Sequence, residues 1–64
     1  MTEWFLAITL IYQVGSVTKV SEDIVYGFKT EQACVRYLNI EDARIKRIKS
    51  QTNIKRYELN CYWR

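Results

Sequence analysis

One uncharged stretch near the start of the chain decides the fold: Trp4-Phe5-Leu6-Ala7-Ile8-Thr9-Leu10-Ile11-Tyr12. Eight of its nine residues are apolar, and it is rich in the β-branched and aromatic types that favour strands. A helix needs about 20 apolar residues to span a bilayer, so the stretch is too short for a membrane segment. Both faces are apolar, because successive side chains of a strand point to opposite sides. The stretch therefore predicts a central, buried strand and no membrane partner.

Composition defines the size and class of the protein. The 64 residues predict a single domain, residues 1–64, and the lack of proline with only two glycines argues against a linker. Hydrophobic residues make up 48% and charged residues 27%, which is typical of a globular chain. A domain this small buries only about 60% of the surface that its unfolded chain exposes. We therefore expect marginal stability unless something else supports the fold.

Charge is divided along the chain. The net charge is +3, but residues 1–43 hold three bases and six acids, whereas residues 44–64 hold seven bases and one acid. This asymmetry favours an acidic partner for the C-terminal third, and the alternative is a basic surface that serves solubility. The candidate basic partner-binding residues are Arg36, Arg44, Lys46, Arg47, Lys49, Lys55 and Arg56.

An export signal is the other interpretation of the opening stretch. A signal peptide needs basic residues before its apolar core and a small-x-small cleavage site after it. Here Glu3 precedes the apolar run, no lysine or arginine does, and Gln13-Val14-Gly15-Ser16 is a poor cleavage site. We therefore expect the strand to be retained and the protein to be cytoplasmic.

A tight turn and a returning strand follow. In residues 14–17 the glycine is the first central residue of a two-residue loop, where a type II′ turn needs a positive φ. The returning strand runs from Val17 to Phe28 and is interrupted by the polar Ser21-Glu22-Asp23. Strict pairing would place Ile24 opposite Ala7. We instead favour a β-bulge at the polar interruption, which gathers the largest side chains on the face of Trp4, namely Ile24, Tyr26 and Phe28.

A helix is expected next. Thr30 is a suitable N-cap, and Glu31 places a negative charge in the first turn. We expect the helix to extend to about Lys49, with Asn39 as the point where it would divide if it were two shorter helices. Its apolar stripe, which Glu41 interrupts, consists of Cys34, Tyr37, Leu38, Ile45 and Ile48.

The last segment, residues 54–63, alternates like a half-buried strand, with Tyr57, Leu59, Cys61 and Trp63 on one face. The order strand, strand, helix, strand predicts an α+β fold of ββαβ form. We expect a three-stranded antiparallel sheet of order 2-1-3, with the helix packed on one face. The first strand is then central, and the chain leaves the other face of the sheet uncovered.

Cysteine positions and missing motifs limit the chemistry. Cys34 and Cys61 both point into the predicted core. A cytosolic setting favours a reduced pair, and the alternative is a disulfide that would add about 3 to 4 kcal/mol. The chain has no histidine and no phosphate-binding glycine loop, and two cysteines cannot complete a tetrahedral zinc site. We expect no catalytic residue, no metal and no cofactor.

Binding is better supported than catalysis. Five tyrosines and two tryptophans form a high aromatic load, and these residues are enriched where interfaces carry their energy. Spacing predicts that Tyr26, Tyr37, Tyr57 and Trp63 lie in the core. The candidate contacts of the aromatic or open sheet face are Phe5, Ile11 and Tyr62. An exposed apolar sheet face favours a partner or a second copy of the chain.

Two segments carry a family resemblance. The run Tyr26-Gly27-Phe28-Lys29-Thr30-Glu31-Gln32-Ala33-Cys34, with Asn60-Cys61-Tyr62 in a closing strand, resembles small phage and prophage accessory proteins of ββαβ form. Several of these are host-directed inhibitors, including anti-CRISPR proteins, which occupy a host complex without catalysis. Those inhibitors are commonly acidic mimics of nucleic acid, whereas this chain is basic. The resemblance implies a host protein or nucleoprotein complex as the partner, and it carries over no contact residue.

Two further partner classes follow from the residues. A nucleic-acid-binding module would use Arg44, Lys46, Arg47, Lys49, Lys55 and Arg56 on phosphates and would stack Tyr62 on a base. A self-associating protein would form a homodimer through its open sheet face.

Overall fold

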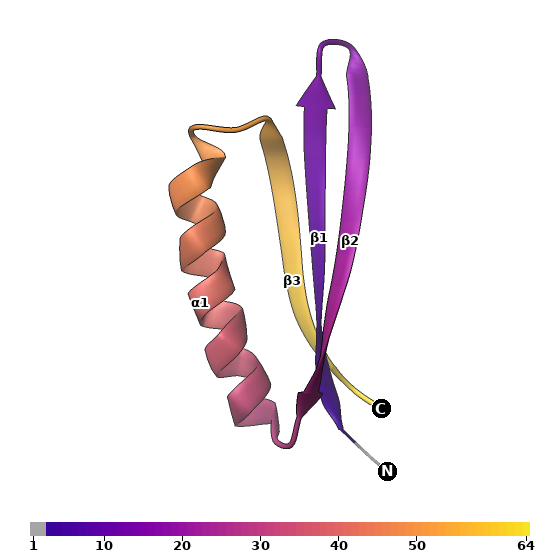
Figure 1. Cartoon of the computed structure of the whole chain (residues 1–64), viewed down its shortest axis with the longest axis vertical. Helices are drawn as coiled ribbons and strands as arrows, with labels where there is room; N and C mark the ends of the chain where they lie inside the picture. The colour runs from indigo at the N-terminus through magenta and orange to yellow at the C-terminus, as the bar shows by residue number, and fades with distance from the viewer. Residues whose placement is uncertain (1–2) are drawn as a thin grey trace.

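The computed structural model describes residues 3–64, and it contains a sheet and one helix. The elements are β1 (Trp4–Val14), β2 (Val17–Phe28), α1 (Glu31–Lys49) and β3 (Ile54–Trp63). The sheet has the order β2-β1-β3, and both strand pairs are antiparallel. α1 packs on one face of the sheet (Figure 1). The predicted ββαβ fold and its central first strand are confirmed.

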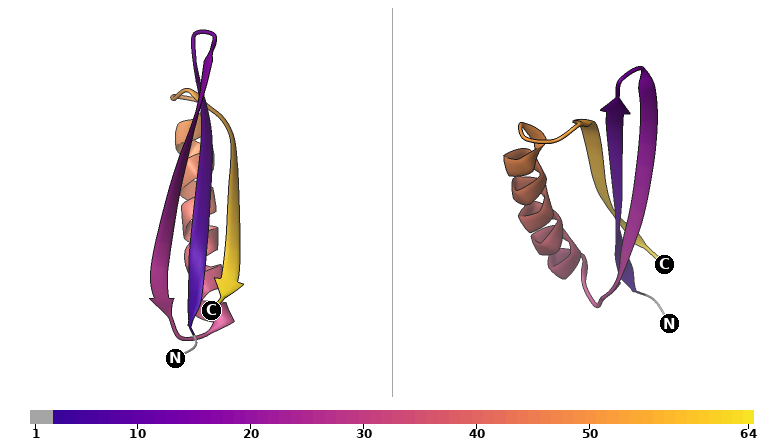
Figure 2. Two further views of the ribbon diagram at one scale, coloured as in Figure 1. Left: turned by 90° about the vertical axis from the view of Figure 1, so that its right-hand side faces the viewer. Right: turned by 45° about the horizontal axis from the view of Figure 1, so that its top comes forward.

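The molecule is long and thin. Its principal extents are 43 × 20 × 11 Å, and its radius of gyration is 13.2 Å, whereas a compact chain of this length has about 10.7 Å. The tip of the β1–β2 hairpin projects beyond β3 and α1 (Figure 1). Figure 2 shows the sheet from the side opposite α1, with no part of the described chain in front of it. One face of the sheet is therefore open.

The core is small and lies between the sheet and α1. Its five buried residues come from β1, α1 and β3, and they are Leu6, Ile8, Cys34, Ile45 and Ile54. Half-buried side chains such as Trp4, Leu10 and Leu59 pack around them. So few buried side chains give limited hydrophobic stabilisation. A covalent cross-link between α1 and β3 therefore contributes a larger share of the stability than it would in a larger domain.

A disulfide joins Cys34 on α1 to Cys61 on β3, with the two Cα atoms 6.2 Å apart. That spacing lies within the range that a disulfide spans. The expected reduced pair is therefore wrong, and the alternative is confirmed. The helical stripe and the alternation of β3 bring both side chains to one point of the core, beside Leu6, which pairs with Cys61 across the sheet.

The hairpin has the predicted turn but a different bulge. Gly15 has a φ of +61° and Ser16 has a negative φ, as a type II′ turn requires. Strict pairing continues from Val14 and Val17 as far as Leu6 and Val25, and the register shifts only between Leu6 and Trp4. Gly27, at that shift, has a φ of +95°, a conformation that one common type of bulge requires and glycine allows.

The bulge expected at residues 21–23 is therefore wrong, and side chains change face as a result. Ile24 lies opposite Ala7, and Tyr26 packs on Phe5, so both lie on the open face. Only Phe28, beyond the bulge, joins Trp4 on the core face as expected. Tyr26 is 52% exposed, and the prediction that it lies in the core is wrong.

The predicted core positions of the other aromatic residues are confirmed in part. Tyr57 packs against the core. Tyr37 is 37% exposed and lies outside the core, although its ring centroid is 5.4 Å from that of Phe28. Trp63 is on the predicted face of β3, opposite Trp4, but it is 63% exposed because it ends the last strand.

α1 is continuous through Asn39. Its N-cap is Thr30, whose hydroxyl oxygen accepts a hydrogen bond from the backbone N–H of Ala33 at 3.1 Å. Glu41, the exception in the apolar stripe, is buried, and its carboxylate accepts two hydrogen bonds from Arg44, the shorter at 2.7 Å. The stripe can hold this acid because a guanidinium from the next turn satisfies it.

Candidate binding surfaces

The seven candidate basic residues do not form one patch. Five of them lie on α1 and two on β3. Three of the helical ones already have partners within the chain. The guanidinium of Arg44 is 2.7 Å from the Glu41 carboxylate, Lys46 lies 3.3 Å from Asp42, and the Lys49 ammonium lies 5.9 Å from the centroid of the Tyr57 ring.

A polar contact holds α1 against β3. The phenol of Tyr57 donates a hydrogen bond of 2.7 Å to the carboxylate of Asp42. This bond, with the nearby Lys46 ammonium, lowers the pKa of Asp42 below its ordinary value, and the same bond raises the pKa of the Tyr57 phenol. Asp42, Lys46 and Lys49 therefore lie on the flank of the helix that faces β3. Asp42 and Lys49 contact Tyr57 on β3, whereas Lys46 pairs with Asp42 within the helix, so all three already have partners in the fold.

One side of α1 has no contact with the sheet. Arg36 and Arg47 are eleven residues apart, which is about three helical turns, so they project on the same side about 16 Å apart. Ile40 lies between them and is 61% exposed. Among residues 3–64, neither arginine takes part in an ion pair. We call this exposed side the outer helix surface, and its residues are Gln32, Val35, Arg36, Asn39, Ile40, Ala43 and Arg47.

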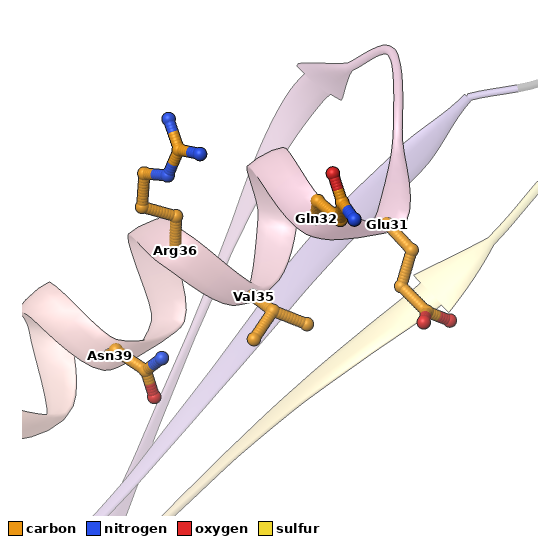
Figure 3. Close-up of a pocket in the computed structure, with 5 residues that line it drawn as sticks. All are labelled: Glu31, Gln32, Val35, Arg36 and Asn39. Atoms are coloured by element: carbon orange, nitrogen blue, oxygen red, sulfur yellow. The ribbon is translucent and has the colours of Figure 1, made fainter.

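A shallow hollow runs along the first turns of this surface. It is lined by Glu31, Gln32, Val35, Arg36 and Asn39. Figure 3 shows that all five side chains come from α1 and that Arg36 points away from Val35 and Asn39. Because one helix supplies the whole lining, the hollow has no opposing wall. It is better suited to receive part of a protein surface than to enclose a small molecule.

The second candidate surface is the open sheet face. Directly paired residues of antiparallel strands share a face, so the register identifies its members. They are Phe5, Ala7, Thr9, Ile11, Gln13, Thr18, Val20, Glu22, Ile24, Tyr26, Arg56, Glu58, Asn60 and Tyr62. The predicted contacts Phe5, Ile11 and Tyr62 all lie on this face, where Phe5 and Ile11 are half-buried by their neighbours and Tyr62 is exposed.

An aromatic cluster occupies the end of the open sheet face that is nearer the chain termini. The Phe5 ring lies 5.8 Å from that of Tyr26 and 5.5 Å from that of Tyr62, measured between centroids. The Arg64 guanidinium lies 5.9 Å from the centroid of Tyr26. The backbones of Arg64 and Glu3 exchange two hydrogen bonds of 2.8 Å, which hold this end of β3 against β1.

The remaining basic pair lies toward the other end of the open sheet face. A shift in the β1–β3 register between Ile11 and Tyr12 leaves Lys55 as an extra residue on β3. Lys55 and Arg56 then line a small hollow together with Ile11 and Thr18. Six residues of extended strand, about 20 Å, separate Arg56 from Tyr62.

These positions decide which predicted residues can act together. The helical bases lie on α1, on the opposite side of the sheet from Tyr62, whereas Lys55 and Arg56 share the open sheet face with Tyr62. Sequence analysis missed Tyr26, Val20 and Ile24 as members of the open sheet face. Strict two-residue-turn pairing, extended to Leu6, was the signal that identifies Val20 and Ile24, and Tyr26 follows from its ring contact with Phe5. Sequence analysis also missed Ile40. Its position on the helix, away from the apolar stripe, was the signal that could have identified it as exposed.

Comparisons with known proteins identify no relative of this chain. No protein-family model, no curated protein and no solved structure matches the chain. In residues 3–64, no helix is both long and apolar enough to cross a membrane. The same residues contain no group of three or more histidine, cysteine or acidic side chains that could hold a metal ion.

Proposed function

We propose that this chain is a small phage-type, host-directed inhibitor that binds a host protein and performs no catalysis. The observation that supports this best is the outer helix surface, where Arg36 and Arg47 flank the exposed Ile40 and none of the three is used by the fold. Arginine beside an exposed aliphatic side chain is a combination suited to an interface.

The chemistry of this surface defines the partner. Two arginines about 16 Å apart, with aliphatic side chains between them, complement a groove that is apolar along its floor and acidic at its rim. Gln32 and Asn39 add polar groups beside the apolar ones. The partner is therefore an acidic protein surface that receives one side of a helix, in contrast to inhibitors that imitate nucleic acid with acidic side chains.

Two considerations bear on where the inhibitor acts. A host-directed inhibitor of this type would act in the host cytoplasm. The Cys34–Cys61 disulfide favours an oxidising compartment, since such bonds are rare in the cytosol. Rapid alkylation of free thiols in expressing cells, followed by mass measurement, decides between the two. A bridged protein in intact cells would exclude the ordinary cytoplasm.

Affinity capture from host lysate tests the function. The bait variants are the wild type, Arg36→Glu/Arg47→Glu, and the matched control Lys19→Glu/Lys29→Glu, which changes the net charge equally at exposed positions away from the outer helix surface. We expect the wild type and the control to capture a host protein that stays bound after nuclease treatment. The Arg36→Glu/Arg47→Glu variant should not capture it. Equal capture by all three baits, or capture abolished by nuclease, would overturn the proposal; the second result would favour the nucleic-acid-binding alternative.

A further inference from the structure

The chain exposes more surface than a folded monomer of its size normally does. The accessible surface of the chain is 4961 Å², whereas a folded monomer of 7.7 kDa has about 4,300 Å². The difference is about 600 Å². Of the eleven exposed large apolar side chains in residues 3–64, four lie on the open sheet face, namely Val20, Ile24, Tyr26 and Tyr62. Val20 is 61%, Ile24 49% and Tyr62 48% exposed there.

Charge indicates what covers this face. Glu22 and Glu58 lie on either side of Thr9, and the next row along the strands contains Ile11 with Arg56. Lys55 lines the hollow beside Arg56. The face therefore holds acidic and basic groups in adjacent rows and has little net charge, although the chain as a whole is basic. A nucleic-acid site needs an excess of positive charge, whereas a balanced face can be complementary to itself.

We propose that a second copy of this chain packs on the open sheet face, forming a two-fold dimer with the two helices on the outside. A standard-size interface buries at least about 600 Å² on each copy, so the two faces must overlap along most of β1 and β2. The dimer is independent of the proposed inhibitor function and would present two outer helix surfaces.

Symmetry selects one arrangement of the two sheets. A two-fold axis parallel to the strands places each row over the same row of the second copy, so that Glu22 faces the Glu58 of that copy. This opposes like charges. A two-fold axis that runs across the strands, between the rows of Thr9 and Ile11, places Glu58 of each copy over Arg56 of the other. The second arrangement forms two symmetry-related ion pairs and is the one that the charges favour.

A charge swap tests this arrangement. Sedimentation equilibrium of the wild type from low micromolar to millimolar concentration should show a reversible monomer–dimer equilibrium. Glu58→Arg and Arg56→Glu should each weaken the dimer about tenfold or more, because each opposes like charges across the axis. The double variant Glu58→Arg/Arg56→Glu should restore it, and the exposed control Lys29→Glu should leave it unchanged.

A second variant keeps the test independent of the ion pairs. Ile24→Lys places a charge in the apolar part of the face, and it leaves no cavity because the side chain is already half exposed. It should abolish the dimer with an unchanged circular dichroism spectrum. A wild type that stays monomeric at millimolar concentration, or a double variant no better than the single ones, would overturn the proposal. If Arg36→Glu/Arg47→Glu no longer captures the host protein but still dimerises, the outer helix surface and the open sheet face act independently.

Discussion

Breaking the Cys34–Cys61 bond should remove a large part of the stability of this protein. The bond closes a loop with a sequence separation of 27, and the chain-entropy relation gives about 3.6 kcal/mol at 25 °C for a loop of that length. Domains have about 0.05 to 0.15 kcal/mol of stability per residue, which gives this chain only roughly 3 to 10 kcal/mol. Reduction should therefore leave the fold close to its limit.

The small core indicates that the disulfide contributes this full free energy to the stability of the fold. Five buried residues form the core, and the disulfide is the one covalent cross-link between side chains of α1 and the sheet in residues 3–64. Cys34→Ala/Cys61→Ala should lower the midpoint of thermal unfolding by about 15 to 25 °C. Alanine is the appropriate replacement at the buried Cys34, because serine would bury an unpaired hydroxyl.

Urea unfolding followed by circular dichroism measures this free-energy difference. The wild type is compared with and without reductant, and the double alanine variant serves as the control because reductant should not change its midpoint. A loss below about 1 kcal/mol on reduction would refute the reasoning, since it would mean that non-covalent packing alone holds α1 on the sheet.

Three further changes test local features. Thr30→Ala removes the hydroxyl that accepts from Ala33 and should cost about 1 kcal/mol in urea unfolding; no change would contradict the cap. Gly27→Ala should cost about 1 to 2 kcal/mol through its positive φ alone, because open space surrounds the position where a Cβ would lie; an equally stable variant would argue against the bulge. Tyr57→Phe removes the hydrogen bond that lowers the pKa of Asp42. In the wild type this bond adds stability above pH 3.8, the pKa of Asp42 in the unfolded chain, and the added stability is lost as pH falls through the lower pKa of the folded protein. The variant should therefore lose less stability in acid. A pH series of unfolding midpoints with identical acid sensitivity in both proteins would exclude that contact.

Local patterns were sufficient to predict the elements and their order. The uncharged run of β1, the Gly15 turn, the Thr30 cap and the alternation of β3 each have a short-range physical cause. The helical stripe was also visible, and Glu41 interrupted it because an acid can be buried once Arg44 satisfies it. The register of β2 was harder, since it depends on which residue can adopt the backbone of a bulge.

The surfaces were harder to predict than the elements. Polar residues at Ser21-Glu22-Asp23 pointed to an interruption, whereas Gly27 was the residue that could take a positive φ. Placing the bulge five residues too early assigned Ile24 and Tyr26 to the core, although both lie on the open sheet face. The cysteine state depended on the compartment as well as on geometry, so sequence patterns alone left two alternatives.

The most direct test of the central claim is the affinity of the captured host protein, once purified, for the wild type and the two charge-reversal variants. Isothermal titration calorimetry should show that Arg36→Glu/Arg47→Glu binds about a hundredfold or more weakly, because two interface arginines are each worth at least about 1 to 2 kcal/mol. Lys19→Glu/Lys29→Glu should bind within about threefold of the wild type. Equal weakening by both variants would mean that net charge alone drives binding, and it would contradict a specific role for the outer helix surface.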